Sequence, residues 1–191
     1  MRPFICGLTG FAGAGKDTAA AFLAEALQAR GRRVEILSFA EPLRAMLRAL
    51  GVPAHYMTDR QLKEQDVPGF NASYRHMAQT LGTEWGRQCM GSNFWLRHLE
   101  MRINQACDAR KVDFVFVTDV RFPNEANWVR ERRGTIVHVD RPGLQRVREH
   151  DSERHALPWD HWISNDADLP SLRNRCNQTS NILLAESALE A

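Results

Sequence analysis

The sequence predicts an α/β fold, in which a doubly wound and mostly parallel sheet carries helices on both faces. Short apolar segments rich in β-branched and aromatic residues alternate along the chain with longer stretches of helical spacing. Segments of the first kind are typical of strands buried on both faces, and their alternation with helices favours right-handed crossovers. We expect five strands, at residues 4–9, 34–39, 112–118, 135–139 and 161–165.

Helices are expected between these strands. Helix-favouring alanine and leucine, first-turn prolines and closing glycines place them at residues 17–29, 42–51, 123–134 and 169–189. Residues 52–72 carry prolines and little apolar periodicity, so we expect an irregular excursion there before two more helices near 73–89 and 93–108. No repeat or linker divides the chain, and we expect a single domain over residues 1–191.

Composition limits the functional classes. With 43% apolar and 25% charged residues and a formal charge of +2, the chain resembles a soluble globular protein rather than one that coats nucleic acid. Its four scattered cysteines lack metal-type spacing and predict reduced thiols in the cytoplasm. No apolar run approaches the roughly 20 residues that span a membrane. We therefore expect neither a nucleic-acid nor a membrane partner, while a homodimer stays open.

The strongest motif is Gly10-Phe11-Ala12-Gly13-Ala14-Gly15-Lys16-Asp17-Thr18, which follows an apolar strand and opens a helix. Its glycines allow backbone N–H groups to point at phosphate oxygens, and Lys16 can reach the outer phosphates. A plain turn requires neither three glycines nor a lysine. The motif predicts a P-loop NTPase fold that binds ATP through Gly10, Gly13, Ala14, Gly15, Lys16, Asp17 and Thr18.

Asp17 stands where this motif ordinarily has Ser or Thr as a magnesium ligand. Asp17 could hold Mg²⁺ through its carboxylate or through a water molecule, or Thr18 could take that role. Our hypothesis is that Asp17 lies in the shell of the metal.

Asp119 and Arg121 follow the apolar segment 112–118 and stand at the carboxyl end of an expected strand. Side chains two residues apart can point the same way. The acid could join the magnesium shell or accept a proton from the acceptor, and the arginine could hold a phosphate with two hydrogen bonds. Alternatively, Asp119 and Arg121 could pair with each other and serve only the structure. The P-loop in the same sheet favours the functional interpretation.

A helical projection of residues 73–87 separates two faces. The apolar face, expected in the core, contains Tyr74, Met77, Ala78, Leu81 and Trp85. The polar side contains Arg75, Gln79, Gly82, Thr83 and Gly86, with Arg87 beside it. Each glycine inside a helix costs about 1 kcal/mol relative to alanine, which requires a compensating reason. Either the close approach of a ligand or close helix packing could be the reason for these glycines. Trp95, further along the chain, could either stack on a base or belong to the core.

The polar connection at residues 140–160 suits a mobile lid. It contains several arginines, one of which could act on the transferred phosphoryl group. Each of these arginines, taken singly, is explained by an ordinary solvated surface. The pattern does not indicate which arginine would contact the phosphoryl group.

These residues together resemble the phage-type deoxynucleoside monophosphate kinases, within the P-loop nucleoside monophosphate kinases. The resemblance rests on the loop at residues 10–18 and on segments 39–44, 75–87, 119–125, 139–142, 150–153 and 163–166. It implies ATP and Mg²⁺ as cosubstrates and a deoxynucleoside monophosphate as the acceptor, which is converted to the diphosphate by direct in-line transfer.

By this resemblance Lys16 contacts the transferred group, and Asp119 and Arg121 are candidates for the acceptor site. We predict these three as catalytic residues and Arg141 as part of the ATP site. The acceptor site, in a helical region at about 41–108 and beyond it, would use Arg44, Arg75, Gln79, Arg87, Trp95 and Glu125. A P-loop kinase for dephospho-coenzyme A or phosphomevalonate is the nearest alternative, since residues 163–166 also resemble dephospho-coenzyme A kinases. An ATP-sensing module that transfers nothing is an alternative of another class.

Overall fold

The computed structural model describes residues 2–144 and 157–189. Contacts within the chain divide it into two compact units, which we describe separately. Unit 1 comprises Met1–Ser38 and Leu99–Ala191 and contains the sheet, whereas unit 2, Phe39–His98, is helical. Unit 2 therefore covers most of the region in which we expected the acceptor-binding helices.

Unit 1 is built on a five-stranded sheet of order β2-β3-β1-β4-β5. The strands are β1 (Phe4–Thr9), β2 (Val34–Leu37), β3 (Phe114–Val117), β4 (Thr135–Asp140) and β5 (His161–Ser164). All four strand pairings of this sheet are parallel. The five predicted strands and the α/β class are confirmed, although β2 and β3 are shorter than the expected ranges and the sheet is wholly rather than mostly parallel.

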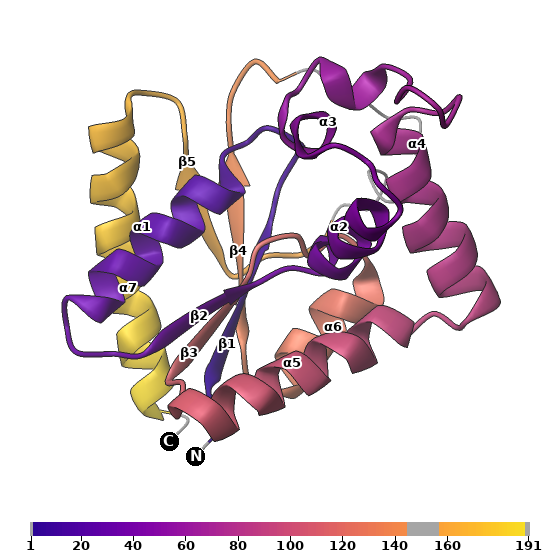
Figure 1. Cartoon of the computed structure of the whole chain (residues 1–191). Coiled ribbons are helices and arrows are strands. Elements are labelled where there is room, and N and C mark those ends of the chain that lie inside the picture. The colour runs from indigo at the N-terminus through magenta and orange to yellow at the C-terminus, as the bar shows by residue number, and fades with distance from the viewer. Residues whose placement is uncertain (1, 145–156, 190–191) are drawn as a thin grey trace. The chain divides into compact units, whose positions relative to one another are not determined.

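Helices cover both faces of this sheet. On one face α1 (Lys16–Gln28) packs along α7 (Leu169–Leu189), as Figure 1 shows. On the other, α6 (Pro123–Glu131) contacts β1 and β4. The helix α5 (Phe94–Arg110) begins in unit 2 and runs on into unit 1. The central strands β1 and β3 are buried along nearly their whole length, as the sequence pattern predicts, whereas the edge strands β2 and β5 are partly exposed.

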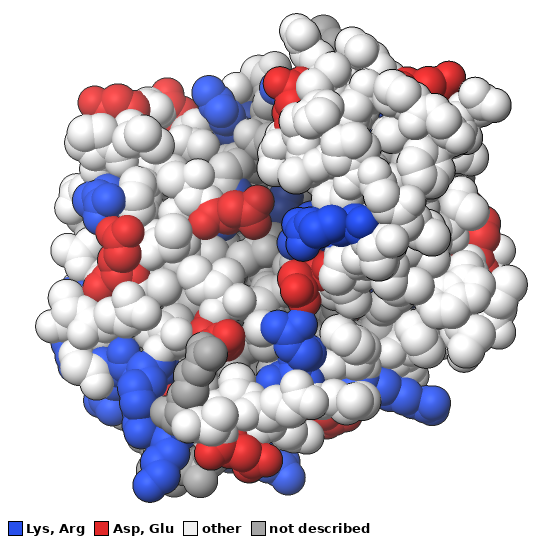
Figure 2. Space-filling view, in the orientation of Figure 1, with Lys and Arg blue, Asp and Glu red and all other residues white. Residues whose placement is uncertain are grey.

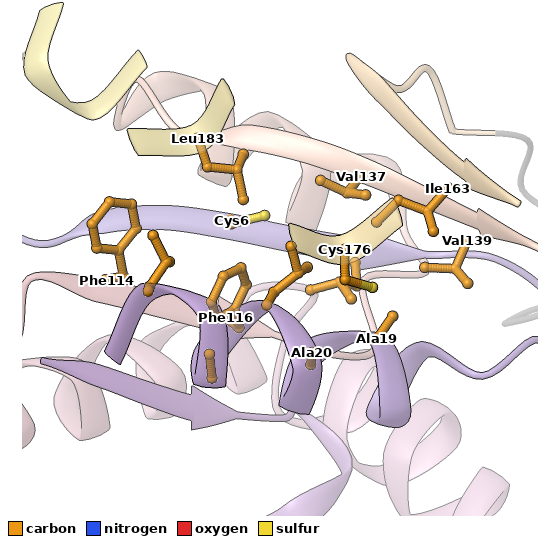
Figure 3. Packing of buried hydrophobic residues seen from close by; sticks show 14 of the residues in the cluster. Cys6, Ala19, Ala20, Phe114, Phe116, Val137, Val139, Ile163, Cys176 and Leu183 are labelled. Atoms are coloured by element: carbon orange, nitrogen blue, oxygen red, sulfur yellow. The ribbon is translucent and has the colours of Figure 1, made fainter. Parts of the chain in front are cut away.

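The main core lies between the sheet and the pair α1 and α7 (Figure 3). Cys6 and Leu8 of β1 point into it and are fully buried. The residue between them, Gly7, faces α6, where an added Cβ would lie 2.8 Å from side-chain carbons of Ile136 and Val120. Glycine at this position thus lets Val120 pack directly against the strand that leads into the P-loop.

Unit 2 comprises α2 (Ala40–Ala49), α3 (Ala54–Thr58), η1 (Leu62–Glu64), α4 (Tyr74–Gln79), η2 (Thr80–Cys89) and the first turn of α5. Its small core contains Leu47, Val52, Met57, Val67 and Tyr74. Helix α2 begins two residues before the predicted start at Pro42. The expectation of an irregular stretch at 52–72 was only partly right, because α3 and η1 lie within it.

The segment η2 is a π-helix, which sequence spacing did not predict. Hydrogen bonds from i to i+5 change which residues share a face, so the α-helical projection fails beyond Gln79. Thr83 and Gly86, expected on the polar side, are buried. A Cβ on Gly86 would lie 2.3 Å from the indole nitrogen of Trp95. Close packing therefore explains this glycine, and the alternative of ligand approach is wrong for it.

Candidate nucleotide-binding site

The P-loop connects β1 to α1 at the carboxyl end of the sheet. Gly10, Gly13 and Gly15 have φ angles of 138°, 82° and 95°, which L side chains rarely adopt. A Cβ on Gly10 would also lie 2.2 Å from the carbonyl oxygen of Val139. The three glycines thus permit the loop conformation expected from the motif. Gly15 precedes α1 without any side-chain cap, so the N–H groups of the first turn are directed into the loop.

Lys16 is only 9% exposed, and its ammonium group lies over this loop. The Nζ atom donates hydrogen bonds to the carbonyl oxygens of Gly10 and Phe11, each at 2.9 Å. A cation held in this way lies next to the N–H groups at the start of α1. The loop therefore concentrates positive charge where it can hold a polyphosphate.

Asn165, which follows β5, supports the P-loop from the neighbouring part of the sheet. Its side-chain amide donates to the carbonyl oxygen of Ala14 at 2.9 Å, and its backbone N–H donates to that of Asp140 at 2.6 Å. A Cβ on Gly15 would lie 2.6 Å from the same amide nitrogen. The sequence indicates Asn165 only as part of a segment that carries the family resemblance, and this role could not be predicted from it because the contact joins distant parts of the chain.

Asp17 and Thr18 lie in the first turn of α1, where a negative charge is favoured by the helix dipole. Asp17 is exposed and Thr18 is half-buried. Both are oxygen ligands of the kind that Mg²⁺ prefers. Among the described residues no group of three or more His, Cys, Asp and Glu side chains is arranged to bind a metal ion.

The turn after β3 lies beside the P-loop. The N–H of Thr118 donates to the carbonyl oxygen of Leu37 and that of Val120 to Leu8, both at 3.0 Å. These bonds extend the contacts of β3 with β2 and β1 past the end of the strand. Asp119 and Arg121 alternate with the two anchored residues and are half-buried. The structure therefore places this pair at the same edge of the sheet as the P-loop.

Glu125 lies in the first turn of α6 and contacts the backbone of the turn after β3. It is 1% exposed, and its Oε2 accepts hydrogen bonds from the backbone N–H groups of Arg121 at 2.7 Å and Phe122 at 3.0 Å. This carboxylate thus holds the turn after β3 from the first turn of α6. These contacts show that Glu125 shapes the turn, and its predicted part in acceptor binding stays a prediction.

Arg141 is exposed and directly follows β4. Its position at the carboxyl end of a central strand agrees with a place near ATP, which stays a prediction. Most of the predicted lid at 140–160 lies outside the described residues, including Arg146, Arg148 and Arg154.

Within unit 2, the positive charges of Arg44 and Arg75 both act on the phenol of Tyr74. Burial raises the pKa of Tyr74, and the positive charges of Arg44, Arg75 and Arg48 oppose that rise. Arg75 also forms an ion pair with Glu64 at 2.5 Å. Two of the predicted acceptor-site arginines therefore act on the same phenol, and one of them is paired with a carboxylate.

The remaining acceptor candidates have local partners. Arg87 donates from Nη1 to the carbonyl oxygen of Ser92 at 3.2 Å, and Gln79 is a half-buried residue of α4. Trp95 is 4% exposed and donates from its indole nitrogen to the carbonyl oxygen of Gly82 at 2.8 Å. Its ring is buried within unit 2, which favours the core role over stacking on a base.

Unit 1 also has a cavity of about 1110 Å³ at the amino ends of its strands, the end opposite to the P-loop. Basic residues line it, and Figure 2 shows Lys and Arg side chains gathered near the end where both termini lie. Helices α1, α5 and α6 end at this edge, and basic residues favour the negative ends of helices. Arg33 pairs there with Asp113 at 2.9 Å. The charge of this cavity therefore has a structural explanation.

The all-parallel sheet and the glycine-rich loop with its lysine define a P-loop nucleotide-binding protein of the α/β class. Within the described residues, none of the helices has the length and apolar character that crossing a membrane requires.

A model of the deoxynucleotide monophosphate kinase family matches residues 54–176. The chain is 31% identical over 166 residues to a putative deoxynucleotide monophosphate kinase of Acanthamoeba polyphaga mimivirus, covering 78% of this chain and 80% of that protein. It is 37% identical over 93 residues to the deoxynucleoside-5'-monophosphate kinase of Escherichia phage T5, covering 47% of this chain and 34% of the phage protein. The chain belongs to the deoxynucleotide monophosphate kinase family and is a phosphotransferase that uses ATP to convert a deoxynucleoside monophosphate to its diphosphate. The family resemblance expected from the motifs is confirmed.

Solved structures of other kinases are more distant. The APS kinase of Mycobacterium tuberculosis is 14% identical over 96% of this chain and 98% of its own, with a TM-score of 0.48. The shikimate kinase of Aquifex aeolicus is also 14% identical, over 98% of this chain and 100% of its own, with a TM-score of 0.46. Likeness at this level says nothing about the acceptor.

Proposed function

We propose that the site at the carboxyl end of the sheet transfers the γ-phosphoryl group of ATP in line to the phosphate of a deoxynucleoside monophosphate, with Lys16, Asp119 and Arg121 as its catalytic residues. The single observation that carries this proposal is the anchored turn that holds Asp119 and Arg121 beside the P-loop. One edge of the sheet then supplies the groups for a donor polyphosphate and for the transferred phosphoryl group.

The transfer needs little proton chemistry. An oxygen of the acceptor phosphate forms a bond to the γ-phosphorus while the bond from that phosphorus to the bridging oxygen breaks, which releases ADP. A phosphomonoester has a second pKa near 6, so most of the acceptor carries two negative charges at neutral pH and has no proton to lose. Asp119 is therefore better suited to the magnesium shell than to the role of a general base.

Positive charge must then offset the negative charge that gathers in the transition state. Lys16 and Arg121 would contact the transferred group, and Arg141 would contact ATP. Asp17, Thr18 and Asp119 are the residues that would hold Mg²⁺, whose chemistry is to neutralise and orient phosphate oxygens. Their oxygen donors fit that ion, as does the exposure of Asp17 at the start of α1.

Unit 2 would contribute the acceptor site. Arg44 and Arg75, whose charges both act on Tyr74, have the planar guanidinium groups that can hold an acceptor phosphate with paired hydrogen bonds. Gln79 and Arg87 remain candidates for contacts with the nucleoside. We further propose that the protein works in the cytoplasm, which its four free cysteines support.

The test is a panel of acceptors with ATP and Mg²⁺. ADP release would be measured by a coupled assay with each of the four deoxynucleoside monophosphates, with dephospho-coenzyme A, with phosphomevalonate and with no acceptor. We expect one or more deoxynucleoside monophosphates to raise the rate by at least about 100-fold over the acceptor-free rate. Equal ATP hydrolysis without an acceptor would refute the proposal, as would transfer to dephospho-coenzyme A alone. The Lys16→Ala variant should lose the reaction in every case.

A further inference from the structure

Four backbone N–H groups between residues 118 and 122 donate hydrogen bonds that hold the turn carrying Asp119 and Arg121. Two of them, from Thr118 and Val120, run to the neighbouring strands at Leu37 and Leu8. The other two, from Arg121 and Phe122, end on one oxygen atom of Glu125. Two of these four hydrogen bonds therefore depend on a single side chain.

The geometry of Glu125 goes beyond an ordinary helix cap. Glu125 is the third residue of α6, and Phe122 is the N-cap residue that precedes the helix. In a capping box the acid at this position accepts a hydrogen bond from the N–H of the N-cap residue. Here the same Oε2 also accepts the N–H of Arg121, one residue further from the helix, at the shorter distance of 2.7 Å. The cap thus extends to the backbone of a proposed catalytic residue.

Because Glu125 is buried, losing its hydrogen bonds would be costly. Glu125 is 1% exposed, and a buried carboxylate is costly unless hydrogen bonds satisfy it. The turn also cannot slide to compensate, because the side chain of Val120 packs against the space that Gly7 leaves open. A shorter side chain at position 125 would leave two N–H groups unsatisfied next to the functional pair.

We infer that Glu125 is a positioning residue for phosphoryl transfer, which fixes the backbone of Arg121 and thereby the place of its guanidinium relative to the P-loop. This inference rests on the proposed function of Arg121. It assigns this role to the length of the Glu125 side chain and to the acceptor oxygen at its end. A shift of about 1 Å in a positioning group can cost about 100-fold in rate.

Two variants separate length from charge. Glu125→Gln keeps the length and an oxygen that can accept both N–H groups but removes the charge, whereas Glu125→Asp keeps the charge and shortens the side chain. We expect Gln to retain kcat within about 10-fold and Asp to lower kcat by about 100-fold, with the KM for ATP changed less than about 3-fold in both. Glu131→Gln, at the exposed end of the same helix, is the matched control and should behave as wild type.

Two further readouts distinguish positioning from direct contact with the acceptor. Amide hydrogen exchange at Arg121 and Phe122 should become faster in Glu125→Asp and remain slow in Glu125→Gln. In a double-mutant cycle, Glu125→Asp should cost less than about 3-fold once Arg121 has been changed to Ala, because the group that it positions is gone. Full additivity in this cycle would overturn the inference, and so would a Gln variant as impaired as the Asp variant.

The same experiments separate this inference from the proposed function. If the wild-type protein transferred phosphate to none of the deoxynucleoside monophosphates, the proposed function would fail. The exchange rates would still show whether Glu125 anchors the turn, and unchanged exchange in Glu125→Asp would overturn the anchoring itself.

Discussion

The side-chain amide of Asn165 donates a hydrogen bond to the carbonyl oxygen of Ala14 at 2.9 Å, across a separation of 151 residues. Ala14 is 1% exposed and lies in the middle of the P-loop. The backbone of Asn165 is tied in turn to Asp140 at the end of β4. The loop that binds phosphate is therefore held by β5 as well as by its own strand and helix.

Replacing Asn165 with Ala should loosen the P-loop. The variant loses one hydrogen bond to a buried carbonyl group, a change worth about 1 kcal/mol or more, so we expect the Kd for ATP to rise by roughly 5-fold to 20-fold. Titration of the protein with ATP by calorimetry measures this. Asn177→Ala removes a surface amide of α7 that contacts Arg30 and should leave the ATP affinity unchanged. An Asn165→Ala protein with wild-type affinity would contradict a supporting role.

Gly15 and Gly31 allow a comparison of two glycines that share a left-handed backbone and differ in their surroundings. Both have positive φ angles, 95° and 75°, but a Cβ on Gly15 would lie 2.6 Å from Asn165 whereas Gly31 has open space. Gly31→Ala should cost only about 1 kcal/mol of unfolding free energy, because of its left-handed backbone. Gly15→Ala should also weaken ATP binding by at least about 10-fold, because the amide of Asn165 must move. Denaturant unfolding and ATP titration would check these results, and equal ATP affinities of the two variants would refute the steric argument.

Asp17 provides a test of the magnesium site. If its carboxylate lies in the shell of the metal, Asp17→Ala should raise the Mg²⁺ concentration needed for half-maximal activity by about 10-fold. Thr18→Ala distinguishes the alternative ligand in the same turn of α1. Initial rates measured over a range of Mg²⁺ at saturating ATP would show the shift. An unchanged dependence in Asp17→Ala together with a shifted one in Thr18→Ala would assign the metal to Thr18.

His138 of β4 predicts an effect of pH on stability. Burial lowers the pKa of His138, and Lys16 acts in the same direction whereas Asp140 opposes it. The unfolded chain therefore binds a proton at this histidine near pH 6.5, while the folded chain binds it only at lower pH. Unfolding free energy should fall as the pH drops below about 6.5, by at most about 1.4 kcal/mol per pH unit from this group.

His138→Gln checks this dependence, because it removes the titrating group. Urea unfolding between pH 5 and pH 8 should show a stability difference between the wild type and the variant that is constant above about pH 7 and moves against the wild type at lower pH. A difference independent of pH would show that His138 does not contribute to the acid sensitivity.

Local patterns were sufficient for much of the fold. The central strands β1 and β3 are almost wholly apolar and buried, as expected of segments that are covered on both faces. The edge strands β2 and β5 are mixed in sequence and partly exposed, and their short β-branched or aromatic runs still marked them. The P-loop was equally predictable, because its glycines meet backbone requirements that arise within the loop itself, as the φ angles of Gly10, Gly13 and Gly15 show. The order of these motifs also indicated the family, which the match to residues 54–176 confirms.

Predictions failed where a residue's role depends on a partner elsewhere in the fold. The amphipathic pattern of 73–87 was projected with an α-helical period, which does not apply to the π-helix at its end. The packing of Gly86 against Trp95 is a tertiary contact and leaves no local pattern. The same contact places Trp95 in the core. Glu125 follows Arg121 by only four residues, yet its role became visible only with the direction of its carboxylate.

The amino-acid sequence by itself determined the strands, the phosphate loop and the kind of chemistry, because hydrophobic periodicity and glycine positions act over a few residues. Only the tertiary structure decided which side chains hold that loop and the turn beside it. Asn165 supports Ala14, and Glu125 supports Arg121, through directional hydrogen bonds whose geometry depends on the folded backbone. Such bonds form only within about 3 Å, a distance that packing of the whole sheet sets.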